Sequence, residues 1–145
     1  MSKSFMIACA EASELHGPAS PLPPNQVLEG KPETRSKELI RSNDKTFYIM
    51  IWDCTAGRFN WNYNKDEALV VLIGEAFITY DGAEERRIGP GDTVFFAAGT
   101  SARWRVPKYI RKVAFLRHTM PKPAGYGVLA WNLLLRKLRG GGGGL

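Results

Sequence analysis

The residues in this chain best suited to chemistry are one carboxylate, one lysine and three aromatic side chains. Glu67 opens an apolar run, so it places an acid at the edge of a candidate core strand. An isolated ionised carboxylate in a core is costly, so it should be paired, hydrogen-bonded or protonated. Lys112 is the candidate partner for it. The aromatic candidates for hydrogen-bond donors and pocket walls are Tyr63, Trp61 and Trp104.

Strand periodicity predicts which side chains lie together, because alternate residues of a β-strand share a face. Three such sets are expected: Glu67, Leu69, Val71 and Ile73; Lys112, Ala114, Leu116 and His118; and Ala102, Trp104 and Val106. The same alternation puts Arg103 on the face opposite Trp104. A ligand pocket built from Glu67, Tyr63, Trp61, Trp104 and Lys112 is the working hypothesis. The alternative is that Glu67 is a structural carboxylate that caps a loop, with the tryptophans filling the core.

The histidine content limits metal and nucleophile chemistry. The chain has only two histidines, His16 in a proline-rich segment and His118 at the end of the last candidate strand. A three-imidazole metal site cannot be built from two residues so placed, and no Ser-His-acid arrangement is readable. The glycines stand at turns, and none forms a phosphate loop before a helix. We therefore expect no metal and no cofactor.

Length and composition predict one domain of 145 residues with enough apolar side chains for one core. No apolar run is long enough to span a bilayer. The first residues carry too short an apolar stretch for a signal peptide, so we expect a cytoplasmic protein. Two cysteines, Cys9 and Cys54, argue against a disulfide framework, and Cys54 is expected in the core.

Charge is divided unevenly along the chain. Residues 1–92 carry 10 basic and 14 acidic side chains, whereas residues 93–145 carry 10 basic and no acidic ones. This asymmetry indicates an anionic partner or, as we favour, two halves that interleave in space and cancel. No nucleic-acid motif accompanies the basic residues, so no nucleic-acid partner is expected.

The order of patterns predicts three parts. Residues 1–34 form a proline-rich arm that should stay outside a sheet ladder, with a short helix possible at Phe5–Leu15. Residues 35–120 show short, evenly spaced strand patterns, with a hairpin turn at Asp81-Gly82. Residues 121–145 contain a break up to Gly127, an amphipathic helix over Val128–Leu138 and a glycine-rich tail. This helix should pack on its own barrel or a partner rather than on an anionic membrane.

Two segments carry a family resemblance. The first runs from Gly57 through Trp61, Tyr63 and Glu67 to Gly74, and the second from Gly91-Asp92 to Gly99. Together they resemble the two motifs of the cupin superfamily, and with Trp52 to Gly57, Trp104 and Arg111-Lys112 they look like the (S)-ureidoglycine aminohydrolase-like cupin subfamily. The resemblance implies an all-β fold, a double-stranded β-helix or jelly-roll barrel, and a homodimer. The strand Thr46–Thr55, apolar on both faces, agrees with a subunit contact.

The motifs depart from the family where it binds metal. The resemblance implies two histidines before Glu67, which here fall on Asn60 and Asn62 or on Trp61 and Tyr63, and a third at Ala102. Only the carboxylate of Glu67 remains. The manganese-dependent activity of the characterised aminohydrolase therefore does not carry over.

These observations support three functional readings. The leading one is a small cupin that binds a small molecule or serves as an accessory module. The second is a metal-independent isomerase, epimerase or hydrolase, with Glu67 or Tyr63 as acid or base and Lys112 or Arg103 as an anion partner. The third is a metal enzyme with unusual ligands drawn from Glu67, Asn60 or Asn62, and Tyr63.

Overall fold

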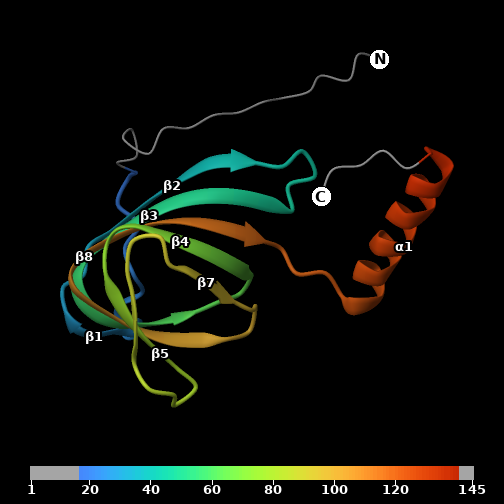
Figure 1. Cartoon of the computed structure of the whole chain (residues 1–145). Helices are drawn as coiled ribbons and strands as arrows, with labels where there is room; N and C mark the ends of the chain where they lie inside the picture. Colours follow the sequence, from blue (N-terminus) through green and yellow to red (C-terminus); the bar gives the residue numbers. More distant parts are fainter. Residues whose placement is uncertain (1–16, 141–145) are drawn as a thin grey trace.

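Two long antiparallel strands organise the fold, which is described here from a computed structural model covering residues 17–140. They are β3 (Phe47–Asn62) and β8 (Ser101–Arg117), and they pair along nearly their whole length. The first half of β3 also pairs with β2 (Thr34–Arg41), and its second half pairs with β1 (Val27–Gly30). One long pair therefore crosses from one side of the barrel to the other (Figure 1).

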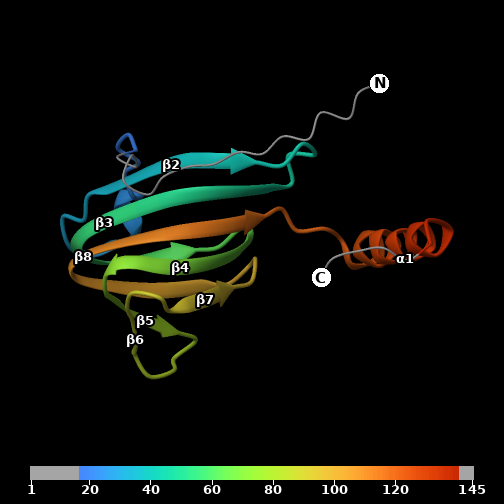
Figure 2. The ribbon, with the colours of Figure 1, turned by 45° about the horizontal axis from the view of Figure 1, so that its top comes forward.

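β8 divides its neighbours in the same way. Its first half pairs with β5 (Ala76–Tyr80), which carries β6 (Arg86–Ile88) at the edge. Its second half pairs with β4 (Asp66–Gly74), which carries β7 (Thr93–Phe96). The sheet curls around these two strands into a barrel, as the jelly-roll fold implied by the family resemblance requires, and Figure 2 shows it from a second side.

Bends in the long strands need residues without a side chain. The β3–β8 register shifts between Thr55 and Gly57, where a Cβ on Gly57 would lie 2.8 Å from the Pro32 ring. Gly74 ends β4 at a φ of +76°, and a Cβ there would meet the Tyr109 carbonyl oxygen at 2.0 Å. Only glycine fits these close approaches. The bend in β3 and the end of β4 therefore each depend on a glycine at that position.

The core fills the barrel with aromatic and aliphatic side chains. Trp104 and Phe59 are its largest fully buried members, and their rings stack with centroids 6.2 Å apart. Alternation on β8 holds as predicted, since Ala102, Trp104 and Val106 are all buried. The Asp81-Gly82 turn also has the expected positive φ at both residues, 47° and 72°.

Ile73 does not follow the predicted alternation of β4. Glu67, Leu69 and Val71 are buried, but Ile73 is exposed. The register between β4 and β8 shifts between Val71 and Ile73, and this irregularity turns Ile73 off the inward face.

Part of the proline-rich arm belongs to the sheet, contrary to expectation. β1 pairs with β3, and Ala19 bridges Arg35 at the edge of β2. The Ser20 N–H donates to the Thr34 carbonyl at 2.9 Å. Prolines remove only their own donors, and at a sheet edge the residues between them still reach their partners.

The C-terminal helix, α1, covers Lys122–Leu138 and starts earlier than predicted. Pro121 is its N-cap and Pro123 stands in its first turn, where a missing N–H costs no helical bond. The helix extends away from the barrel in both views, and none of its side chains is buried (Figures 1 and 2). The prediction that this helix packs on its own barrel is therefore wrong. Within residues 17–140, no helix has the length and hydropathy needed to cross a bilayer.

The predicted helix at Phe5–Leu15, together with Cys9, His16 and the end of the glycine-rich tail, lies outside the described residues.

Candidate functional site

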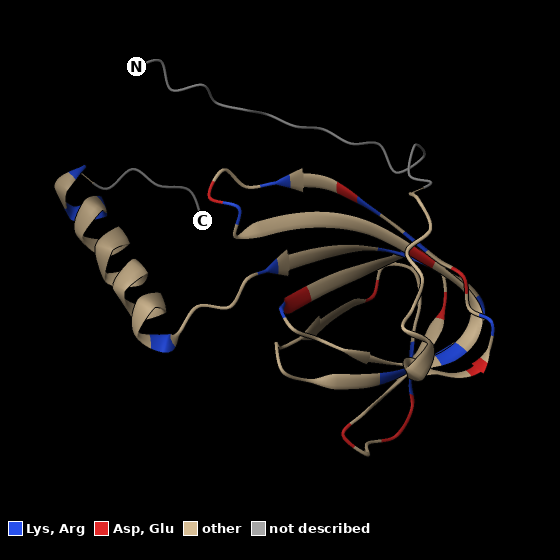
Figure 3. Cartoon of the chain, turned by 180° about the vertical axis from the view of Figure 1, so that it is seen from behind, with Lys and Arg blue, Asp and Glu red and all other residues tan. Residues whose placement is uncertain are grey.

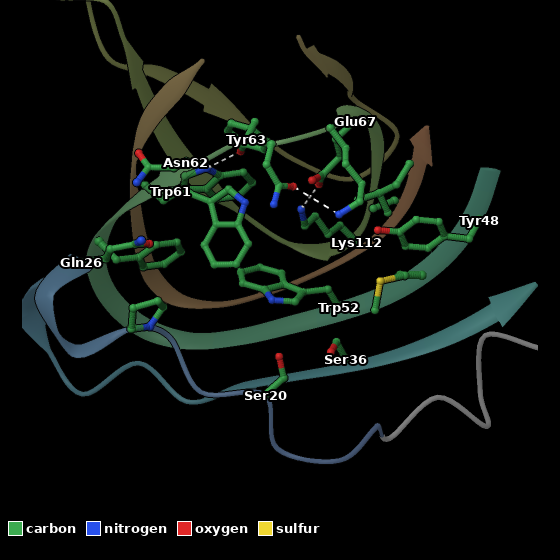
Figure 4. A pocket seen from close by; sticks show the side chains of 18 residues that line it. Ser20, Gln26, Ser36, Tyr48, Trp52, Trp61, Asn62, Tyr63, Glu67 and Lys112 are labelled. Carbon is green, nitrogen blue, oxygen red and sulfur yellow. Dashed lines mark hydrogen bonds and ion pairs between the residues drawn. The ribbon is translucent and has the colours of Figure 1, made fainter. Parts of the chain in front are cut away.

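One cavity of about 390 Å³ opens into the barrel interior, and all five candidate residues line it (Figure 4). Glu67 comes from β4, Lys112 and Trp104 from β8, and Trp61 from β3, while Tyr63 directly follows β3. The strand crossing described above therefore brings together residues that are up to about 50 positions apart in sequence. The remaining lining residues are Ser20, Pro23, Gln26, Ser36, Tyr48, Met50, Trp52, Phe59, Asn62, Asn64, Lys65, Ala114 and Leu116.

A buried ion pair forms the polar part of the cavity wall. The Lys112 Nζ donates to Glu67 Oε1 at 2.5 Å, and the two residues are only 6% and 5% exposed. Glu67 lies opposite Leu116 in the register of β4 and β8. Lys112 is four residues before Leu116, so it lies on the same face of β8 but two side-chain positions away. The long lysine side chain spans that offset. The carboxylate is thus paired, as burial requires, and it does not cap a loop.

Two indole rings support the Lys112 ammonium from the other side. Its Nζ lies 4.9 Å from the Trp52 ring centroid and 5.2 Å from that of Trp104. Trp52 is the direct β3 neighbour of Lys112 in the register. The negative faces of the rings add to the attraction of Glu67, so the positive charge is held in a defined place.

Tyr63 and Trp104 form a second polar contact in the wall. The Trp104 Nε1–H donates to the Tyr63 hydroxyl at 2.9 Å, and the Tyr63 ring stacks on Phe96 with centroids 4.2 Å apart. Burial, and next the negative charge of Glu67, raise the pKa of Tyr63 far above its ordinary value. Tyr63 is therefore a neutral phenol in the cavity, suited to donate a hydrogen bond rather than to act as a base.

The mouth of the cavity comes partly from a segment that sequence reasoning did not assign to it. Ser20, Pro23 and Gln26 precede β1 and line the cavity opposite the ion pair (Figure 4). No sequence signal marks these residues, because their position depends on how the segment crosses the barrel. Trp52 was also missed as a wall residue, although alternation with Tyr48 and Met50 could have found it.

The donor set does not fit a transition metal. No group of three or more His, Cys, Asp or Glu side chains comes together anywhere in residues 17–140. The amide oxygen of Asn62 accepts from Ser101, the Tyr63 hydroxyl accepts from Trp104, and the carboxylate of Glu67 is bonded to an ammonium. Lys112 thus supplies the positive charge beside Glu67 that a cation would otherwise bring.

Two other reactive groups lie away from this chemistry. Burial raises the pKa of the Cys54 thiol to about 12, so the group stays protonated and inert. Arg103 is exposed, on the face of β8 opposite Trp104, as alternation predicted. The structure therefore does not bring Arg103 to the cavity.

Comparisons with known proteins bear on the fold. A family model described as the EutQ-like cupin domain matches residues 41–114, about half of the chain. No curated protein sequence matches the chain. The EutQ protein of Clostridium difficile superposes with a TM-score of 0.53 at 21% identity, over 60% of this chain and 69% of its own. A putative ethanolamine utilization protein Q from Salmonella typhimurium gives 0.53 at 23% identity, over 59% and 69%.

A higher TM-score, 0.64, belongs to a protein of unknown function of the DUF861 family from Pseudomonas syringae. The identity is 26%, and the match covers 70% of this chain but only 44% of the other. The solved structures thus agree on the barrel, at identities that carry no residue roles.

Proposed function

Because this chain belongs to the EutQ-like cupin family, we propose that its barrel binds a small polar molecule, with a lysine in place of the metal that cupins of the aminohydrolase type hold. The Glu67–Lys112 pair would anchor the ligand, and the aromatic side chains would enclose it. A cavity of 390 Å³ is within the range of small-molecule sites.

The observation that carries this proposal is a buried charge pair that faces open space. Buried ion pairs gain little stability over apolar side chains of similar size, because desolvation offsets their attraction. A barrel built only for stability would fill the space beside Trp104 with apolar groups. Keeping Glu67 and Lys112 against a cavity instead supports a role in recognition.

The hydrogen-bonding groups that the pair leaves unused indicate the ligand chemistry. Only Oε1 of Glu67 accepts from Lys112, and Oε2 accepts no hydrogen bond from a described residue. The ammonium has three N–H donors, of which the carboxylate takes one. A ligand with an adjacent donor and acceptor can therefore bond to both groups at once. The indoles of Trp52 and Trp61 offer flat surfaces to the rest of the molecule.

A thermal-shift screen with small carboxylates, ureides and sugars tests the proposal. We expect at least one compound to raise the unfolding temperature of the wild-type chain in a concentration-dependent way. The double variant Glu67→Gln/Lys112→Met should lose that shift. Glu85→Gln is the matched control, because Glu85 also pairs with a β8 cation, Arg105, but on the surface. A shift that survives in the double variant would contradict the proposal.

Acid–base catalysis without a metal is a second proposal, and the unoccupied Oε2 of Glu67 favours it. A carboxylate oxygen that accepts no hydrogen bond from residues 17–140, beside a fixed ammonium, can take a proton from a ligand while Lys112 stabilises the resulting anion. Tyr63 would donate rather than accept. Any compound found in the screen would be followed by NMR with catalytic amounts of protein. Turnover lost in Glu67→Gln supports catalysis, and binding without turnover supports the binding module.

Homodimer formation is proposed as well. Tyr48, Met50 and Trp52 of β3 line the cavity, so the half-buried Ile49 lies on the opposite face of the same strand. Phe47, also on that face, stacks with Phe115 and is exposed. Such an apolar outer face supports contact with a second copy. Placement beside the (S)-ureidoglycine aminohydrolase-like cupins rests on the motif residues alone and implies no activity.

A further inference from the structure

Helix α1 carries an apolar surface that nothing in residues 17–140 covers. Val128, Trp131, Leu134 and Leu138 recur at intervals of three and four, so they share one face of the helix. Trp131, Leu134 and Leu138 are 60%, 49% and 74% exposed. A second apolar face with the same spacing holds Tyr126, Leu129 and Leu133, all of them exposed.

The polar residues of α1 occupy little of its circumference. Asn132 and Arg136, with Arg139 just after the helix, are spaced by four and three and form one narrow sector. The other charged residues stand near the ends, Lys122 at the start and Lys137 in the last turn (Figure 3). The middle of the helix is therefore apolar on more than one side, a wider surface than a single groove of a protein would cover.

Every charge on this segment is positive. Residues 122–139 contain four basic side chains and no acidic one. In the barrel, late basic residues find early acidic partners, since Arg105 pairs with Glu85, Lys112 with Glu67 and Arg117 with Asp66. None of the four basic residues of the helical segment forms an ion pair with a described residue. The expected pairing of late basic residues with early acidic ones thus holds for these three residues of β8 but for none of the four in the helical segment.

Charge also argues against a second copy as the occupant. Two α1 helices side by side would bring only cations near one another, with no carboxylate to set their register. An anionic bilayer surface supplies the opposite charge without a required register. Lysine and arginine can lay their methylene stems on the apolar layer while their charges reach the headgroups, and Trp131 and Tyr126 suit the same interface.

We propose that α1 docks the barrel on the surface of an anionic phospholipid bilayer, with the helix lying in the interface. The broad apolar surface provides the insertion and the basic residues provide the lipid preference. Residues 118–121 link β8 to α1, and the helix stands clear of the barrel (Figures 1 and 2). This proposal does not depend on what the cavity binds.

Co-sedimentation of the full chain with lipid vesicles tests it. Wild-type protein should bind vesicles of equimolar phosphatidylcholine and phosphatidylglycerol much more tightly than vesicles of pure phosphatidylcholine, with binding weakened by salt. Arg136→Gln/Lys137→Gln should weaken binding to the anionic vesicles about 25-fold, at roughly fivefold per cation. Leu134→Asp should reduce it at least about tenfold, because it puts a charge into the apolar face.

Phe95→Asp is the matched control, since Phe95 is an apolar residue on β7, away from the helix, and at 63% exposure it is at least as accessible as Leu134 at 49%. It should bind like the wild type. Because Leu134 is not part of the core, its variant should keep the wild-type unfolding temperature, so lost binding cannot be ascribed to unfolding. Light scattering of the lipid-free proteins measures their oligomeric state.

Four outcomes would overturn the proposal. The first is wild-type protein that stays in the supernatant with anionic vesicles at low salt. The second is binding that Arg136→Gln/Lys137→Gln abolishes but Leu134→Asp leaves intact, which would mean non-specific attraction. The third is equal loss in Phe95→Asp and Leu134→Asp. The fourth is an oligomer that only Leu134→Asp dissociates, without vesicle binding, which would identify α1 as a contact between copies.

Discussion

Two buried charge clusters stand back to back on the same strands. On β3 and β8, Trp52 and Lys112 face the cavity, while the next register pair, Asp53 and Arg111, faces outward. Both clusters bury a carboxylate, Glu67 inside and Asp53 outside. Their surroundings differ in how completely protein groups satisfy that carboxylate.

Asp53 is fully engaged by protein donors. Arg35 donates from Nε at 3.0 Å and from Nη2 at 2.5 Å, and the Tyr109 hydroxyl donates at 2.8 Å. Among residues 17–140, Glu67 accepts a hydrogen bond from Lys112 alone, and it borders open space. The comparison teaches that burial of a charge does not by itself mark a binding site. In a structural cluster, protein donors bond to both carboxylate oxygens. In the candidate site, one carboxylate oxygen is left to accept a hydrogen bond from a ligand.

The largest effect is expected where the interior pair is broken. Glu67→Gln leaves the Lys112 ammonium buried without a counter-charge, so the free energy of unfolding should fall by about 3–5 kcal/mol. Glu67→Gln/Lys112→Met should recover most of that loss, because it removes both charges and adds apolar contact with Trp52 and Trp104. Urea unfolding monitored by circular dichroism measures both. A double variant no more stable than the single one would mean that the pair is structural.

A smaller effect is expected at the outer cluster. Asp53→Asn should lower the free energy of unfolding at pH 7 by about 1–2 kcal/mol. The cost stays below that of the interior change because Arg35, which is 40% exposed, can turn to water. Urea titrations at neutral pH give this value, and a loss as large as that of Glu67→Gln would remove the distinction between the clusters.

The contribution of the outer cluster to the free energy of unfolding should also depend on pH in the acid range. Burial alone would raise the pKa of Asp53, but hydrogen bonds from Arg35 and Tyr109 outweigh it and hold the pKa below its ordinary 3.8. The folded state therefore binds this proton more weakly than the unfolded state. Its contribution is present above pH 3.8 and is lost as the pH falls through the lower folded value. The stability gap between wild type and Asp53→Asn should narrow below pH 4, and a constant gap would contradict the assignment.

The smallest effect is expected at the surface pair of Glu85 with Arg105. Arg105 bonds to both oxygens of Glu85, at 2.6 and 3.0 Å, but solvent reaches both side chains. Water and salt screen such pairs, so Glu85→Gln should leave the urea midpoint unchanged within error. A clear drop would show that geometry at the surface matters more than burial in this barrel.

Much of the fold and part of the site could be predicted from the sequence. Turn glycines and period-two alternation define the barrel strands, and alternation groups Glu67 with Leu69 and Val71, and Lys112 with Ala114. The cupin resemblance implied that the Glu67 face lines the interior. The alternation failed at Ile73 because a register shift has no sequence marker here. Ser20 and Gln26 could not be assigned to the cavity, since long-range packing alone brings them there.

The measurement that tests the central claim most directly is elemental analysis of the full-length chain, purified without chelator or affinity metal. The claim is that Lys112 holds the positive charge beside Glu67, so manganese, zinc, iron and nickel should all be far below stoichiometric amounts. A stoichiometric transition metal that disappears in Glu67→Gln would contradict it.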